Sequence, residues 1–265
     1  MGTSQIVSLE GSGTALPDIL ALSIGHVALA LRCAGPRLRQ PAGNRYAEFR
    51  AGSEGALPVH VNGAASPAKV PAEFEYRLEE ARVRFDGVEA HFVGVRHEYA
   101  LDSLLRVLLS WVLLPRMGFL LHAATVERNG RAYVFTGRSG AGKSTVASLS
   151  PMGSVLTDEI SLLRRVNGEW RAYGTPFWGE FRAAGTNRSA PIAGIFKLVQ
   201  ARESAVRPMP PREALRALLP NVLFFSSDGR AAERLLEILA DAAAQVPSSE
   251  LRFRRDASFW EALPV

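Results

Sequence analysis

The first hundred residues alternate between short apolar runs and segments that contain glycine or proline, a pattern typical of strands joined by turns. Strands are expected at 27–32, 46–50, 57–61, 74–78, 81–85 and 88–92. Asp86-Gly87, between the last two runs, favours a two-residue hairpin turn, because these residue types tolerate positive φ angles. The pattern predicts an N-terminal β-rich domain over residues 1–100, folded as a mainly antiparallel meander.

Residues 101–114 repeat apolar side chains at the spacing of a helix, and Pro115 limits that helix. Strands expected at 120–127 and 132–136 flank Asn129-Gly130, which favours an antiparallel hairpin. A glycine-rich stretch and a helix from Lys143 onward follow. In many folds with such a glycine-rich stretch, the strand before it has parallel neighbours that are reached through helices. Here the Asn-Gly hairpin instead predicts an antiparallel neighbour for that strand.

A second hairpin is predicted soon afterwards, with strands at 160–166 and 169–173 around Asn167-Gly168. The remaining expected elements are a loop at 174–191, strands at 192–200 and 250–254, helices at 212–219 and 231–244, and a short helix at 257–263. The sequence therefore predicts an α/β fold, in which a mixed sheet belongs to a second domain over residues 101–265.

Residues 137–145 read Gly-Arg-Ser-Gly-Ala-Gly-Lys-Ser-Thr and match the pattern of a phosphate-binding P-loop (Walker A motif) between a strand and a helix. The glycines allow backbone N–H groups to face a phosphate, and a helix N-terminus adds partial positive charge. Lys143 is expected to contact the β- and γ-phosphates, and Ser144 to bind Mg²⁺. The residues expected to bind ATP are Gly137, Ser139, Gly140, Ala141, Gly142, Lys143, Ser144 and Thr145.

Asp158 and Glu159 follow a short apolar run at 155–157, fifteen residues after Lys143. If this strand lies beside the strand that leads into the P-loop, one of the two carboxylates can hold Mg²⁺, directly or through water, while the other orients or deprotonates an attacking hydroxyl. The alternative is a surface acidic pair that caps a turn. His122 lies in an apolar run, where it is equally consistent with a core residue and with an imidazole that hydrogen-bonds Asp158 or a phosphate.

Composition excludes several classes of protein. With 47% hydrophobic residues, 22% charged residues, 23 glycines and 16 prolines, the chain is neither disordered, collagen-like nor fibrous. A single cysteine, Cys33, excludes an intramolecular disulfide and cannot by itself supply a zinc site, and a reducing cytoplasm is expected.

The net charge of +5 does not predict a nucleic-acid partner, because the basic residues are almost all arginines spread without a run. No apolar stretch is long enough to span a membrane, and the first residues show no targeting signal.

Several of these stretches resemble the catalytic domain of bacterial HPr kinase/phosphorylase and its shorter relatives, over about residues 120–200. They are the segment from His122 to Val126, the following Asn-Gly hairpin, the P-loop, and Leu156-Thr-Asp-Glu. The resemblance implies a fold like that of phosphoenolpyruvate carboxykinase, in which a P-loop serves a mixed sheet. It also implies catalytic roles for Lys143, Asp158, Glu159 and His122, and Mg²⁺ binding by Ser144 and Asp158.

Residues 173–180, with Arg188, look like small HPr-kinase-related proteins found beside peptide-modification genes, some of which phosphorylate a serine in a precursor peptide. The resemblance implies a kinase that uses ATP and Mg²⁺ to phosphorylate a serine of a peptide or small protein. Arg182, Arg188 and Trp178 are the candidate substrate contacts. A small-molecule kinase and a non-catalytic nucleotide-binding sensor or assembly factor are the alternatives, and a homo-oligomer is left open.

Overall fold

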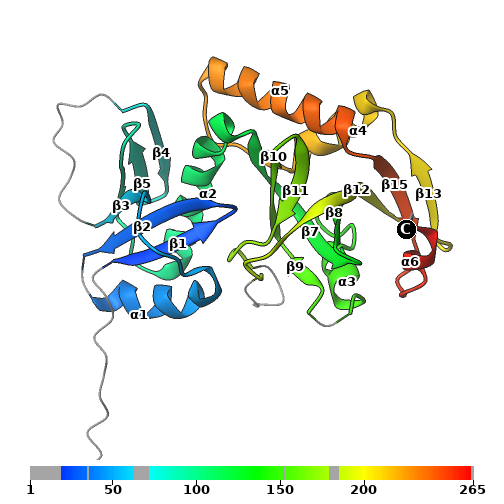
Figure 1. Ribbon diagram of the computed structural model, residues 1–265, viewed down its shortest axis with the longest axis horizontal. Coiled ribbons are helices and arrows are strands. Elements are labelled where there is room, and N and C mark those ends of the chain that lie inside the picture. The colour runs from blue at the N-terminus through cyan, green and yellow to red at the C-terminus, as the bar shows by residue number, and fades with distance from the viewer. Residues whose placement is uncertain (1–18, 35, 63–71, 152, 179–184, 264–265) are drawn as a thin grey trace, which may run out of the picture.

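The computed structural model describes residues 19–34, 36–62, 72–151, 153–178 and 185–263, and its strands form two mixed sheets (Figure 1). The first residues, on which the expectation about a targeting signal rests, lie outside the described residues, and so does Arg182. Within the described ranges, none of the helices has the length and apolar character that a membrane crossing needs.

The N-terminal half builds a six-stranded sheet in the order β1-β2-β3-β6-β5-β4. Its elements are β1 (Leu20–Ile24), β2 (Val27–Cys33), α1 (Pro36–Arg45), β3 (Leu57–Val61), β4 (Phe74–Leu78), β5 (Ala81–Phe85) and β6 (Ala90–Val93). The chain leaves β2 through α1 and returns in β3, which pairs with both β2 and β6 in parallel. The other neighbouring strands pair antiparallel.

The predicted meander is therefore wrong in its centre, and the predicted strand at 46–50 is wrong as well. Those residues follow α1 and contain a short 3₁₀ turn at Ala47–Phe49. Tyr46 and Phe49 are both fully buried, and their spacing of three suits a helical turn that points two rings at one core. The predicted hairpin after β5 is present, but its connection has four residues, because Phe85 pairs with Ala90.

Helix α2 (Glu98–Val112) lies between the two sheets, as Figure 1 shows. His97 caps its start, since the imidazole Nδ1 accepts the Ala100 N–H at 3.2 Å. Its buried leucines belong to a cluster that also holds residues of both sheets, among them Leu29 of β2 and Leu162 in the second sheet. The domain boundary at residue 100 stays a prediction, because this cluster spans it.

The second half builds a nine-stranded sheet with the main order β11-β10-β7-β8-β12-β15-β13. Its strands are β7 (Gly118–Arg128), β8 (Arg131–Thr136), β9 (Val155–Thr157), β10 (Ile160–Val166), β11 (Glu169–Tyr173), β12 (Ser189–Gln200), β13 (Ala205–Pro208), β14 (Val222–Leu223) and β15 (Ser248–Phe253). Its helices are α3 (Lys143–Ser148), α4 (Pro211–Leu218), α5 (Gly229–Gln245) and α6 (Phe259–Ala262). The predicted mixed α/β architecture is confirmed.

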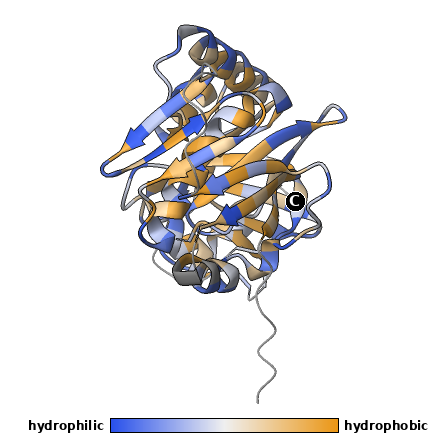
Figure 2. Cartoon of the chain, turned by 90° about the vertical axis from the view of Figure 1, so that its left-hand side faces the viewer, coloured by the Kyte–Doolittle hydropathy of each residue, from blue (hydrophilic) through white to orange (hydrophobic). Residues whose placement is uncertain are grey.

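Helices cover both faces of this sheet, since alternate residues of each strand point in opposite directions. Ala132 and Val134 of β8 pack with α4 and α5, whereas Tyr133 and Phe135 pack with α3 and α6. Figure 2 views the molecule from the side of the N-terminal sheet and shows both hydrophilic and hydrophobic segments along the strands.

Candidate active site

The predicted P-loop, residues 137–145, joins β8 to α3 and bends through left-handed backbone conformations. Gly140 has φ +75° and Gly142 has φ +113°, values that favour glycine. A Cβ added at Gly142 would lie 2.4 Å from Cζ of Phe253 on β15, so the loop runs directly over this ring. The glycines therefore permit both the backbone shape and the close packing beneath it.

Lys143, the first residue of α3, is buried and folds back on the P-loop. Its ammonium Nζ donates to the carbonyl oxygens of Gly137 at 2.9 Å and of Arg138 at 3.3 Å. Burial lowers the pKa of Lys143, and the charge of Glu159 acts in the opposite direction. A phosphate is a stronger acceptor for an ammonium than a neutral carbonyl, so it can replace these two partners.

The acidic pair lies on the turn between β9 and β10. Strand β10 pairs antiparallel with β7 so that Ile160 faces His122, and the Ala123 N–H donates to the Glu159 carbonyl at 3.1 Å. This register places the Glu159 carboxylate 3.4 Å from Nε2 of His122. Glu159, the second member of the acidic pair, is therefore a partner of His122 at this site.

One detail of the predicted geometry is wrong. Strand β9 pairs with β7 and not with β8, the strand that leads into the P-loop. The place beside β8 belongs to β12, which pairs with it in parallel and is much longer. Asp158 is nevertheless buried at the end of β9.

The Glu159 carboxylate is the electrostatic centre of the site. The hydrogen bond from His122 lowers the pKa of Glu159, against the opposing effect of burial, and the charges of Arg106 and Lys143 lower it further. Three nitrogen groups from β7, α2 and the P-loop thus act on one carboxylate. Glu159 consequently stays ionised at neutral pH and can accept hydrogen bonds.

Arg106 is a site residue that the sequence analysis did not identify. It extends from α2, and its guanidinium lies 5.1 Å from the ring centroid of Phe177. Burial lowers the pKa of Arg106, whereas the charges of Asp102 and Glu159 raise it. The available signal was a single arginine in the apolar helical run of residues 101–114.

The loop after β11 begins and ends beside the acidic pair. The Thr175 hydroxyl donates to the Ile160 carbonyl at 2.6 Å. A Cβ at Gly174 would lie 2.0 Å from the Thr186 carbonyl oxygen, and one at Gly185 would lie 2.2 Å from that of Leu156. Both ends of the loop are therefore packed tightly against backbone, and only glycine fits these contacts.

The candidate substrate contacts on this loop have different surroundings. Trp178 is half-buried, with the Arg45 guanidinium 4.2 Å from its ring centroid. Arg188 forms an ion pair with Glu127 at 3.0 Å and donates to the Gly153 carbonyl at 2.6 Å. Glu127 lies five residues beyond His122 on β7, about 16 Å along a strand, so the structure does not bring Arg188 to the acidic pair.

The donor set suits ATP and Mg²⁺. Mg²⁺ prefers hard oxygen ligands, and the Ser144 hydroxyl and the Asp158 carboxylate supply them. The glycine backbone over Phe253 leaves room for a phosphate at Gly140, where a Cβ would meet no atom within 4 Å. Lys143 adds a cation, so the residues present fit a phosphate group with its metal.

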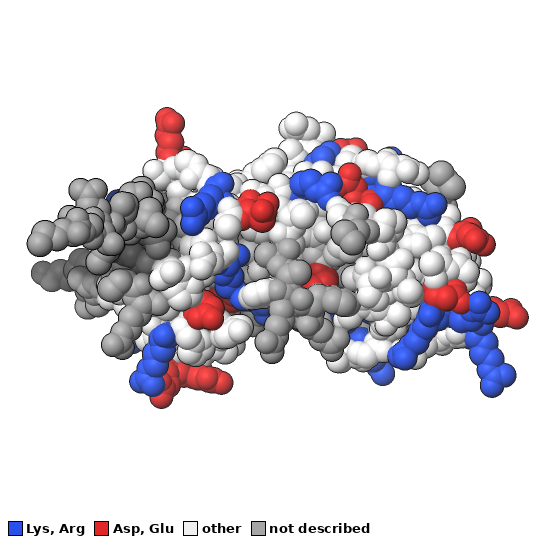
Figure 3. Space-filling model, turned by 90° about the horizontal axis from the view of Figure 1, so that it is seen from below, with Lys and Arg blue, Asp and Glu red and all other residues white. Residues whose placement is uncertain are grey.

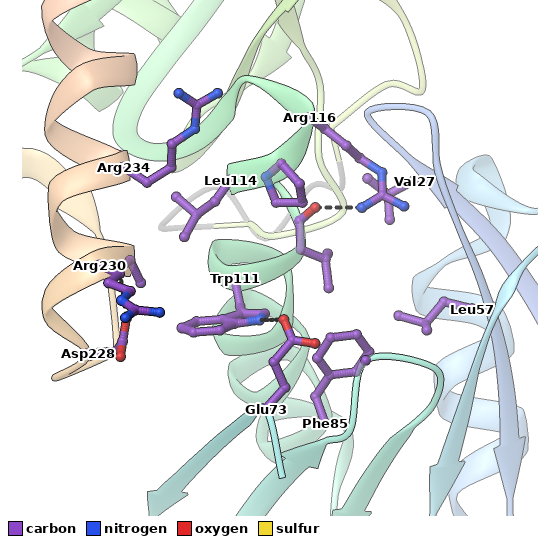
Figure 4. A pocket seen from close by; sticks show the side chains of 14 residues that line it. Val27, Leu57, Glu73, Phe85, Trp111, Leu114, Arg116, Asp228, Arg230 and Arg234 are labelled. Carbon is purple, nitrogen blue, oxygen red and sulfur yellow. Dashed lines mark hydrogen bonds between the residues drawn. The ribbon is translucent and has the colours of Figure 1, made fainter. Parts of the chain in front are cut away.

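The rest of the surface offers a different cavity and no charged patch on the face drawn in Figure 3, where basic and acidic side chains are interspersed. The cavity has a volume of about 520 Å³ and lies between the N-terminal sheet, α2 and α5 (Figure 4). Trp111 points into it and donates to the Glu73 carboxylate at 3.1 Å. None of the P-loop residues or the acidic pair lines this cavity.

The chain was compared with solved structures, curated proteins and family models. The HPr(Ser) kinase/phosphatase from Coxiella burnetii is 13% identical, and the match covers 46% of this chain and 87% of that chain. Its TM-score of 0.27 is too low to carry an argument. A search of curated proteins found no match.

The family comparison is more extensive. The model of the family described as "SynChlorMet cassette protein ScmC" matches residues 102–264, which is more than half of the chain and includes the P-loop, the acidic pair, His122 and Arg106. The chain therefore belongs to the ScmC family of SynChlorMet cassette proteins.

Proposed function

We propose that the protein is a kinase that transfers the γ-phosphoryl group of ATP, with Mg²⁺, to a serine hydroxyl of a peptide or small protein. The observation that carries the proposal is the convergence of the P-loop Lys143 and the His122–Glu159 pair on one site. The proposed fold is a P-loop domain like that of phosphoenolpyruvate carboxykinase. Its support is the antiparallel β7–β8 hairpin that leads into the P-loop.

In the proposed reaction, Lys143 leaves its carbonyl partners and binds the β- and γ-phosphate oxygens of ATP. Ser144 and Asp158 would hold Mg²⁺, which when bound offsets negative charge on the phosphates. The serine oxygen forms a bond to the γ-phosphorus while the bond to the bridging oxygen of ADP breaks. The hydroxyl proton passes to the acidic pair, and ADP leaves.

The role we propose for Glu159 follows from its charge. A carboxylate whose pKa is lowered is a weak base but a good hydrogen-bond acceptor. Phosphoryl transfer with a loose transition state depends more on the position of the attacking hydroxyl than on early proton removal. Glu159 therefore orients the hydroxyl, and the neighbouring His122 holds the carboxylate in place.

The acceptor we propose is a peptide encoded beside the gene. The name of the family refers to a cassette, which fits an enzyme whose substrate is made by a neighbouring gene. The loop that starts at Gly174 supports an extended acceptor, since both of its ends are packed beside the acidic pair. Trp178 on this loop offers an aromatic surface for such a chain.

The test is to incubate the protein with ATP, Mg²⁺ and peptides encoded by neighbouring genes, and to measure mass. We expect a gain of about 80 Da on one peptide and none after its acceptor serine is changed to alanine. Lys143→Ala should abolish the gain and weaken ATP binding in calorimetry. Lys197→Ala is the matched control, because this lysine pairs with Glu250 instead.

Other results would select other functions. Phosphorylation of free serine or another small metabolite, with no peptide modified, would identify a small-molecule kinase. ATP binding without turnover in the presence of every neighbouring peptide would favour a nucleotide-binding sensor or assembly factor. Unchanged ATP affinity and turnover in folded Lys143→Ala protein would refute the P-loop interpretation.

A further inference from the structure

A second cluster of chemically active side chains lies on the N-terminal sheet. His60 of β3 and His91 of β6 have stacked rings, with centroids 4.9 Å apart and planes inclined by 11°. Both Nε2 atoms face one carboxylate. His60 lies 3.0 Å from Oε2 of Glu89, and His91 lies 2.9 Å from Oε1 of the same residue.

The sheet register produces this cluster. Strands β3 and β6 pair in parallel with His60 opposite His91, so both imidazoles lie on one face. Their neighbours Val59, Val61 and Phe92 point to the other face and are fully buried in the core. The core residues on the opposite face therefore fix which way the two histidines point.

The glutamate is held by its own turn. The Asp86 carboxylate Oδ1 accepts the N–H groups of Val88 at 3.0 Å and of Glu89 at 2.9 Å. Gly87 in this turn has φ +93°. The backbone of Glu89 is thus fixed by contacts that do not involve either histidine.

Strands β3 and β6 are also held together by contacts that do not involve either histidine. The Asn62 side chain donates to the Val95 carbonyl at 2.6 Å and accepts the Val95 N–H at 2.9 Å, which ties the end of β3 to the end of β6. All three side chains of the cluster consequently stand on a rigid frame. A preformed frame of this kind lowers the ordering cost of binding an ion.

We propose that His60, Glu89 and His91 form a binding site for a divalent transition-metal ion of the Zn²⁺ type. Imidazole nitrogens and a carboxylate are ligands that such ions prefer. The three ligand atoms lie within 4.8 Å of one another. A tetrahedral ion with bonds of about 2.0–2.1 Å needs them about 3.3 Å apart, which small side-chain rotations provide.

Exposure indicates how such a site would be completed. The side chain of His91 is 9% exposed, whereas those of His60 and Glu89 are 25% and 34% exposed. The cluster is therefore closed on the β6 side and open to water at His60 and Glu89. Three protein ligands with an open fourth position accept a water molecule or another small ligand.

The surrounding charges set the expected affinity. In the register of the sheet, Arg32 of β2 lies opposite His60, and Arg84 of β5 lies opposite His91. An arginine therefore stands on each side of the cluster. Asp86 and Glu89 offset these two charges. A divalent ion with a single carboxylate ligand between two arginines should bind more weakly than in a closed structural site.

The experiment titrates tag-free protein with ZnCl₂ in a calorimeter and, separately, with Co²⁺ while its visible absorption is recorded. We expect one equivalent to bind, and a Co²⁺ spectrum of four-coordinate type. His60→Gln and Glu89→Gln should each weaken binding at least about tenfold, since each removes one of three ligands. His26→Asn, in the exposed turn between β1 and β2, is the matched control.

A second measurement guards against loss of fold. The wild type should show a higher Tm with Zn²⁺ than with a chelator, because the ion binds only the folded chain. His60→Gln protein should keep the Tm of the chelated wild type and lose the response. Equal Zn²⁺ affinity in the wild type and both ligand variants would overturn the proposal, and so would loss of the bound equivalent in His122→Gln alone.

Discussion

Asp102 provides the strongest test of how the two halves of the chain are joined. On α2, its carboxylate accepts hydrogen bonds from the Arg45 guanidinium and the Tyr46 hydroxyl, which stand at the end of α1. The side chains of Arg45 and Asp102 are only 5% and 3% exposed. Removing one member of such a pair leaves a buried charge without its counter-ion.

The expected cost of Asp102→Ala follows from these contacts. Loss of one partner of a buried ion pair typically costs about 3–5 kcal/mol. The charge of Asp102 also acts on Arg106, so two guanidinium groups lose it and then repel each other. We therefore expect a loss toward the upper end of that range, about 4–5 kcal/mol, which is a large share of the stability of a typical domain.

The assay is urea unfolding followed by circular dichroism, which gives the free energy of unfolding from its midpoint and slope. Asp228→Ala is the matched control, because this aspartate caps α5 by accepting the Ala231 N–H at 2.7 Å, and loss of such a cap costs about 1 kcal/mol. The double variant Arg45→Met/Asp102→Leu should recover most of the loss, since it leaves no unpaired charge. If Asp102→Ala costs no more than Asp228→Ala, the buried network does not join α1 to α2 as argued.

Three further predictions concern the candidate site. Gly142→Ala should abolish ATP binding and lower the free energy of unfolding in urea by about 1–3 kcal/mol more than the control Gly130→Ala. Both glycines have positive φ, but only at Gly142 would an added Cβ clash with Phe253. Because the pKa of Glu159 is lowered in the folded state, the wild type should have a higher free energy of unfolding than Glu159→Gln above a pH of about 4.3, and this difference should shrink below that pH in a series of unfolding curves. A difference that does not change with pH would contradict the ion pair. Arg188→Ala should change the free energy of unfolding by less than about 1 kcal/mol and leave the peptide KM unchanged, because the Arg188–Glu127 ion pair is half-exposed and lies away from the acidic pair. A raised KM would identify Arg188 as a substrate contact.

Features that depend on neighbouring residues could be predicted from the sequence. Asn129-Gly130 and Asn167-Gly168 both form the expected hairpin turns, with positive φ at all four residues. Helix α2 (Glu98–Val112) could be predicted, within a few residues at each end, because apolar residues recur at helical spacing over residues 101–114. These signals are local, and the tertiary contacts of these segments are compatible with them.

Features set by distant contacts could not be predicted. Helix α1 has an internal proline, Pro41, and its sequence gave no helical signal, yet it makes β2 and β3 parallel. Without α1, six short strands are most simply arranged as a meander. The pairing of β9 with β7 likewise depends on a longer strand, β12, occupying the place beside β8.

The candidate site shows the same division. The P-loop lysine and the acidic pair carry a strong pattern in sequence, whereas the partner of His122 depended on the register of β10 against β7. Arg106 depends on the orientation of α2, which is set by the buried cluster on both of its sides. Periodicity indicates a helix, but it does not tell what a single charged residue on that helix faces.

The buried cluster that spans both sheets has a consequence for how the chain can be divided. The family match begins at residue 102, inside α2, and leaves the N-terminal sheet outside. Residues of that sheet nevertheless pack in the same buried cluster as the leucines of α2. A fragment starting at the family boundary would carry the whole candidate site and still expose one side of its first helix to water. The N-terminal strands thus cover an apolar surface of the second half, and a fragment without them is expected to aggregate through that surface.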